Sequence, residues 1–231
     1  MNTLLAALAI LGFVAALFWW SREGAAKAKL ERRAAIDPIL PLIDGAAFEE
    51  NAADYPKVRG LYEGRPVLVA PHLDSIGVRK LPVLWLMVTF PGKYDIDGAG
   101  GGAIAVMMRP RNTEYWSPFE QLDVAVPTPP GFPEHANVRA QNEGSARAVN
   151  LLLPLAGLLA EPNTKEILLT SKAVRITMRA AEADRGNYLL MRGATFAGFK
   201  LDTATVEPVL QHAHSLVLAI EARAKLENSN A

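Results

Sequence analysis

An antiparallel β-hairpin is predicted by KVRGLYEGRPVLVA, residues 57–70. Two strand-like runs, 57–62 and 65–70, flank the dipeptide Glu63-Gly64, and a two-residue connection of this kind typically joins neighbouring antiparallel strands. The following run, LPVLWLMVTF at 81–90, is apolar almost throughout. Such a pattern is typical of a strand that is covered on both faces. These segments favour a sheet of sequential strands.

Further strands and two helices are expected along the rest of the chain. A helix at 145–160 contains Pro154, which should kink or split it. A second helix ends near Leu226, because apolar residues from Val206 to Ala224 recur at helical spacing. Strands are expected at 103–108, 137–141, 165–170, 174–180 and 187–192. The expected order along the chain is five strands, a helix, three strands and a second helix. This order predicts an α+β fold, with helices on one face of a mostly antiparallel sheet.

A single transmembrane helix is predicted at the N-terminus. Residues 3–20 form an 18-residue run without charge, which at ~1.5 Å per residue covers about 27 Å of a ~30 Å hydrocarbon core. Trp19 and Trp20 fit the aromatic belt at the membrane interface, and Arg22 can snorkel beside them. A cleaved signal peptide is the alternative. It is disfavoured because no Lys or Arg precedes the run and bulky Phe18 stands where small cleavage-site residues belong.

The charges that follow this run predict the direction of insertion. Between Arg22 and Arg33 there are five basic and two acidic residues, so residues 21–231 are expected in the cytoplasm. The predicted domains are a signal anchor at 1–20, a charged helical stalk at 21–41, an α+β domain at 42–227 and a tail at 228–231. A duplicated domain would divide into 42–162 and 163–227.

Composition excludes several classes of site. The chain has no cysteine, so disulfides, thiolate metal sites and cysteine nucleophiles are impossible. Its formal net charge of zero and pI of about 6.9 argue against a nucleic-acid binder. No spacing among the four histidines matches a metal site. We therefore predict no metal, no cofactor and no nucleic-acid partner.

Two segments are weak candidates for chemistry. His72, Asp74 and Ser75 lie within four residues and suggest a hydrolase, but catalytic partners normally come from separate elements, so a polar segment after a strand is favoured. The glycines of GAGGGA, residues 98–103, match the dinucleotide fingerprint G-x-G-x-x-A, with Gly98, Gly100 and Gly101 as candidate cofactor-binding residues. No amphipathic helix follows them, so a hairpin loop between two strands is the favoured interpretation.

One further segment suggests a partner surface. Tyr115 and Trp116 follow Arg109-Pro-Arg111 in a polar stretch, and aromatic residues and arginine dominate interface energetics. Packing of these two rings on the sheet is an equally good interpretation. Trp85, by contrast, is expected in the core.

The sequence as a whole favours a non-enzymatic binding or scaffold module at the cytoplasmic face of a membrane. Its expected partners are the lipid bilayer, through residues 3–20, and another membrane or envelope protein. The alternative is a membrane-tethered, hydrolase-like enzyme that uses the segment His72/Asp74/Ser75 or the glycine-rich loop 98–102.

Overall fold

The described strands of the protein form one antiparallel sheet. The structure is a computed structural model and describes residues 2–50, 54–75, 81–111, 113–186, 188, 196 and 198–229. Within these ranges nine strands are ordered β1-β2-β3-β4-β9-β8-β5-β7-β6 across the sheet. They are β1 (Asp44–Glu49), β2 (Lys57–Tyr62), β3 (Arg65–Asp74), β4 (Val83–Pro91), β5 (Ala103–Met108), β6 (Val124–Val126), β7 (Ala136–Ala140), β8 (Thr164–Thr170) and β9 (Ala173–Glu182).

The hairpin of β2 and β3 is confirmed. Tyr62 pairs with Arg65, and the turn residues Glu63 and Gly64 have φ angles of +49° and +73°. Two positive φ angles are typical of a type I′ turn, whose twist matches that of the strands it joins.

The predicted order of elements is wrong. Seven described strands precede α2 (Glu143–Ala146), the first α-helix of the domain, and two follow it. Five were expected before it, because β1 and β6, the two edge strands, lack a clear strand pattern. The strand expected at 187–192 lies outside the described residues. The expected hairpin between 81–90 and 103–108 is also wrong, because β9 and β8 lie between β4 and β5. The glycine-rich segment therefore connects β4 to β5 across the ends of β9 and β8, which lie between them.

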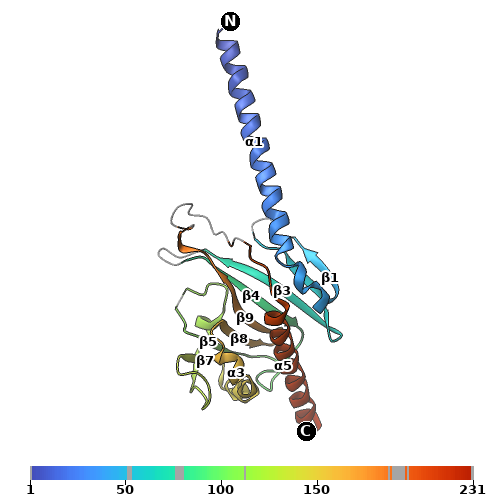
Figure 1. Cartoon of the computed structure of the whole chain (residues 1–231). Coiled ribbons are helices and arrows are strands. Elements are labelled where there is room, and N and C mark those ends of the chain that lie inside the picture. Colours follow the sequence, from blue (N-terminus) through green and yellow to red (C-terminus); the bar gives the residue numbers. More distant parts are fainter. Residues whose placement is uncertain are drawn as a thin grey trace.

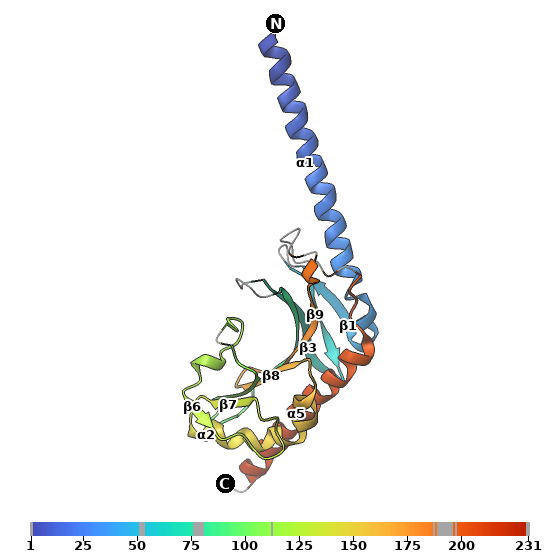
Figure 2. The same ribbon diagram turned by 60° about the vertical axis from the view of Figure 1, so that its left-hand side comes forward.

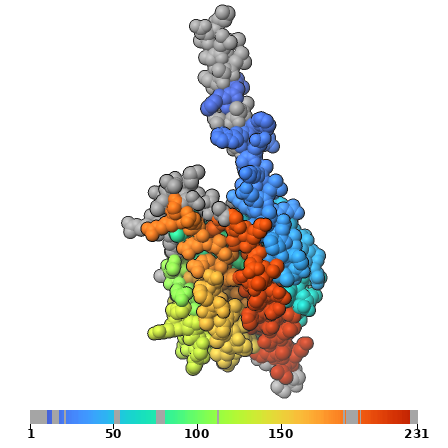
Figure 3. Space-filling model, viewed as in Figure 1, coloured from blue at the N-terminus to red at the C-terminus, as the bar shows by residue number. Residues whose placement is uncertain are grey.

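Helices cover one face of this sheet. The longest is α5 (Thr203–Ser229), which contacts β4 and β9 and also two 3₁₀ helices, η1 (Asp37–Leu42) and η3 (Arg147–Leu155). The predicted helix at 145–160 is divided into α2, η3 and α3 (Ala156–Ala160), and Pro154 lies inside η3 next to its last residue. The boundary between η3 and α3 lies beside the proline, as expected, whereas the boundary between α2 and η3 does not. Figure 3 shows α5 beside residues 147–160 on the surface of the molecule.

The sheet is bent, and its two faces have different covers. Figures 1 and 2 show α5, η3 and α2 on the convex side, which we call the outer face. Alternate side chains of β4 point there, and Leu84, Leu86, Val88 and Phe90 are at most 1% exposed, as the two-residue period of a strand requires. The opposite, concave side is the inner face. It is partly covered by residues 109–111 and 113–123, which we call the cover segment.

The N-terminal helix α1 (Asn2–Ala34) extends away from the sheet (Figure 1). Among the described residues, no helix is both long enough and apolar enough to cross a membrane. The predicted transmembrane anchor at 3–20 is therefore contradicted. Physically, α1 is one uninterrupted helix whose second half is charged from Arg22 onward. Trp19 and Trp20 are exposed on it, and the guanidinium carbon of Arg22 lies 5.7 Å from the centre of the Phe18 ring.

Candidate functional site

The inner face of β4 is only half buried. Val83, Trp85, Met87 and Thr89 point to this face and are all partly exposed, whereas the residues between them are buried. The expectation that 81–90 is covered on both faces is therefore wrong. Leu68, His72 and Asp74 of β3 lie on the same face, and His72 pairs directly with Trp85.

The cover segment packs on the neighbouring part of the inner face. Phe119 and Leu122 form a buried cluster with Ala105, Met107 and Leu168 of β5 and β8. The cover segment therefore closes one half of the inner face. The half formed by β3 and β4 keeps its partial exposure.

Two buried ion pairs accompany this packing. Lys165 Nζ lies 2.7 Å from Glu114 Oε1, with the side chains 9% and 8% exposed. Arg175 Nη2 lies 2.8 Å from Glu166 Oε2, whose side chain is fully buried. The hydroxyl of Ser117 donates to the other oxygen of Glu166. Charged groups of β8 and β9 thus bind the cover segment to the sheet.

His72 connects the cover segment to the open half of the inner face. Its Nε2 lies 3.0 Å from the hydroxyl of Tyr115, and its Nδ1 lies 3.9 Å from Asp54 Oδ2. Asp54 is oriented by the backbone amides of Tyr55 and Leu73, which donate to its two oxygens. The acid beside His72 is therefore Asp54, which precedes β2.

Asp74 and Ser75 do not complete a catalytic group with His72. Asp74 Oδ2 accepts a hydrogen bond from the indole nitrogen of Trp85 at 3.4 Å. Ser75 is exposed just after β3 ends, and no hydrogen bond joins its hydroxyl to His72 within the described ranges. The structure brings His72 and Asp74 to one face of β3 but gives each a different partner.

Aromatic rings and two carboxylates meet at this place. The ring centres of Trp85 and Trp116 are 5.8 Å apart. Burial raises the pKa of Tyr115, and the negative charges of Asp74 and then Asp54 raise it further. In the part of the chain that the structure describes, no Lys or Arg lies within ion-pair distance of either aspartate. We call Asp54, His72, Asp74, Trp85 and Tyr115 the aromatic–acidic site.

The glycine-rich loop turns its amides toward the protein itself. The amides of Gly98 and Gly100 donate to Asp95 Oδ1 at 2.7 and 3.0 Å. Those of Ala99 and Gly101 donate to Asp97 Oδ1 at 2.9 and 3.0 Å. A dinucleotide site needs such amides, and a helix N-terminus after them, for the pyrophosphate. Here the chain's own carboxylates accept these hydrogen bonds, and strand β5 follows.

Histidine and carboxylate side chains show no metal-binding cluster among the described residues. His214 of α5 packs instead against the rings of Tyr62 and Phe90.

Sequence reasoning missed the partners that define the site. Asp54 lies in a polar segment without a motif, and Glu114 and Glu166 are ordinary charged residues in the sequence. One signal was present, because the charged pair Lys165-Glu166 begins an otherwise apolar strand. Charged residues are seldom fully buried without a partner.

The comparisons with known proteins identify no relative: no family model, no curated protein and no solved structure matches this chain.

Proposed function

We propose that the protein is a non-enzymatic binding module that receives a positively charged side chain, lysine or arginine, of a partner protein at the aromatic–acidic site. Trp85 is partly exposed there, and the carboxylates of Asp54 and Asp74 lie beside it and Tyr115. Aromatic faces attract organic cations by about 0.5–2 kcal/mol, depending on desolvation. A carboxylate adds a charge-assisted hydrogen bond.

One observation carries this proposal. The chain already contains a guanidinium against a tryptophan and a carboxylate: the guanidinium carbon of Arg175 lies 5.8 Å from the centre of the Trp116 ring, and Arg175 is paired with Glu166. Trp85 and Asp74, on β4 and β3 of the same inner face, are a second tryptophan–carboxylate pair, comparable to Trp116 and Glu166. Within the described chain, no Lys or Arg forms an ion pair with Asp74 or lies over the Trp85 ring, and Arg179, the cross-strand neighbour of Trp85, is bonded to Asn163 and Glu182 instead. A partner's cation would complete this second pair.

Titration with an arginine-containing tetrapeptide tests the proposal. Binding is followed by the fluorescence of the inner-face tryptophans in a variant with Trp19→Phe and Trp20→Phe. We expect saturable binding that weakens with ionic strength. Asp74→Asn should raise the Kd about tenfold, which corresponds to about 1.4 kcal/mol. The matched control Asp44→Asn removes an exposed carboxylate from β1 and should leave the Kd unchanged. Equal Kd values for the two variants would refute the proposal.

A hydrolase is a second candidate, because His72 stands between a carboxylate and a phenol. In this case His72 would act as a general base toward water, oriented by Asp54. The p-nitrophenyl esters of acetate and phosphate are suitable substrates for a first assay. Turnover that disappears in His72→Gln and persists in Asp44→Asn would support the enzyme. Turnover that is equal in both variants, or absent throughout, would exclude His72 as the base for these esters.

A further inference from the structure

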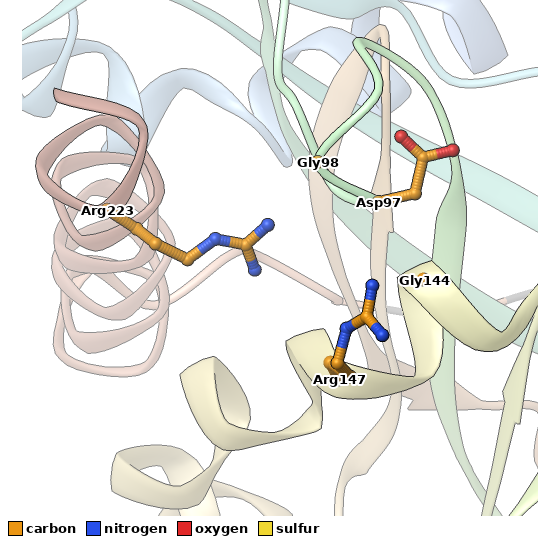
Figure 4. A pocket seen from close by; sticks show the side chains of 5 residues that line it. All are labelled: Asp97, Gly98, Gly144, Arg147 and Arg223. Atoms are coloured by element: carbon orange, nitrogen blue, oxygen red, sulfur yellow. The ribbon is translucent and has the colours of Figure 1, made fainter. Parts of the chain in front are cut away.

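A cavity of about 220 Å³ lies between the glycine-rich loop, η3 and α5, and is lined by Asp97, Gly98, Gly144, Arg147 and Arg223 (Figure 4). We propose that it binds a small oxyanion, a phosphate or carboxylate group, between the guanidinium groups of Arg147 and Arg223. This site lies on the outer face, away from the aromatic–acidic site, and does not depend on the function proposed above.

Two arginines from separate elements converge on this cavity. Figure 4 shows Arg147 extending from η3 and Arg223 from α5 into the space next to Gly98. Arg223 is oriented by a hydrogen bond from its Nη2 to the carbonyl oxygen of Ile96 at 3.2 Å. The side chain of Arg147 forms no hydrogen bond or ion pair in the described part of the chain, so its guanidinium is available to a ligand.

The nearby carboxylates are bound elsewhere. Asp97 accepts from the amides of Ala99 and Gly101 and from Asn142 Nδ2 at 3.2 Å. In Figure 4 its carboxylate is turned away from the two guanidinium groups. Glu221, two residues before Arg223, makes two hydrogen bonds with Arg65, at 2.6 and 2.7 Å. The lining thus contributes two guanidinium groups and one carboxylate, and that carboxylate already accepts three hydrogen bonds from the protein.

The shape and chemistry of the cavity favour a small ligand with several oxygens. Pockets for drug-sized ligands measure about 300–1,000 Å³, so this one is smaller. A guanidinium presents a planar fork of N–H donors that matches carboxylate and phosphate oxygens. Gly98 and Gly144 add no side chain to the lining. A Cβ at Gly144 would lie 2.8 Å from the carbonyl oxygen of Asp97, so a larger residue does not fit there.

Thermal unfolding with inorganic phosphate, at ionic strength held constant with sodium chloride, tests this site. We expect a saturable rise in Tm for the full chain, since a ligand that binds only the folded state stabilises it. Arg147→Gln should raise the phosphate concentration needed for a given rise in Tm at least tenfold. Arg147→Lys keeps the charge but loses the fork, and should give an intermediate loss. The matched control Arg111→Gln removes an exposed arginine from the cover segment and should respond as the original chain does.

A second titration, with acetate, distinguishes the two oxyanions. A response to phosphate alone assigns the site to phosphoryl groups, and a response to both assigns it to oxyanions in general.

Because Arg147 is exposed, its variants should keep the Tm of the original chain without ligand. The proposal is overturned if phosphate gives no saturable rise, if Arg147→Gln responds like Arg111→Gln, or if chloride alone reproduces the effect.

Discussion

At the scale of single residues, Gly102 shows how tightly the loop before β5 is packed. Its φ is +84°, and a Cβ there would collide with Ser145 Oγ and lie 2.9 Å from Asp97 Cβ. Gly102→Ala should therefore combine backbone strain of about 1–2 kcal/mol with an overpacking cost of about 1–3 kcal/mol. Urea unfolding, followed by far-UV circular dichroism, measures the sum.

Gly100→Ala is the matched control for this prediction. Gly100 has nearly the same φ, +82°, but its Cβ would meet nothing within 4 Å. It should show the strain without the overpacking, so its loss of stability should be the smaller of the two. Equal losses would mean that the contact with Ser145 imposes no cost.

Asp97 should make stability depend on pH in the acidic range. Hydrogen bonds from the amides of Ala99 and Gly101, and then from Asn142, lower its pKa below the ordinary value of 3.8. A lowered pKa in the folded state means that the ionised group stabilises the fold above about pH 4. This contribution is lost as the pH falls through the folded-state pKa.

The measurement for Asp97 compares the original chain with Asp97→Asn. Urea unfolding at pH 7 should show the variant to be less stable, and the difference should shrink at pH 3. A difference that stays constant between these pH values would contradict the assigned role of the carboxylate.

At the scale of elements, the cover segment depends on buried charge. Burial on its own would raise the pKa of Glu114. The hydrogen bond and charge of Lys165, with the amides of Arg111 and Thr113, outweigh burial and lower it. Where the cover segment meets the sheet, Trp116 Nε1 of the cover segment and Arg175 Nε and Thr177 Oγ1 of β9 are buried without hydrogen-bond partners in the described chain. Removing one partner of the pair should therefore be costly.

Glu114→Leu should destabilise the protein by about 3 kcal/mol, because a buried charge loses its partner. Lys165→Met should destabilise the protein by a similar amount, because it leaves the carboxylate of Glu114 buried without its partner. The double variant should be less destabilised than the sum of both, since no isolated charge remains. Urea unfolding of the four proteins completes a double-mutant cycle. Strict additivity would show that the 2.7 Å contact contributes no coupling.

The elements also show which parts of the fold the sequence could predict. The hairpin at Glu63-Gly64 was predictable because two adjacent residues determine the turn. The strands that pair with β4 were not predictable, because its uniformly apolar sequence could pair with any other buried strand. The predicted anchor at 3–20 rested on the composition of that run alone, and among the described residues no helix is both long enough and apolar enough to cross a membrane.

The candidate site was predictable only in part. His72 and Asp74 stood out because they are polar residues at the end of an apolar strand. The partners of His72, Asp54 and Tyr115, come from other segments. The partner of Asp74, Trp85, is brought close by the pairing of β3 with β4. Strand pairing over long sequence separations has no short motif, so these contacts required the structure.

At the scale of the whole molecule, α5 connects distant parts of the chain. It contacts η1 near the N-terminus, β4 and β9 in the centre of the sheet, and η3 beyond β7. The two hydrogen bonds of Arg65 with Glu221 join β3 to it. Just before α5 begins, the amide of Leu201 donates to the carbonyl oxygen of Ala35. The buried side chains of α5 belong to the same apolar cluster as residues of β2 to β5 and β7 to β9.

This arrangement predicts a single cooperative unfolding transition. Leu210 of α5 is fully buried, so Leu210→Ala should cost about 2–5 kcal/mol through lost burial and a cavity. The control Leu218→Ala changes a side chain of the same helix that is 45% exposed, and should cost less than about 0.5 kcal/mol.

In the Trp19→Phe/Trp20→Phe background, fluorescence reports the inner face and far-UV circular dichroism the whole fold. Both urea midpoints should fall together in Leu210→Ala, because the outer and inner faces share the same strands. A midpoint that falls by circular dichroism while the fluorescence midpoint stays in place would show that the inner face folds independently of α5.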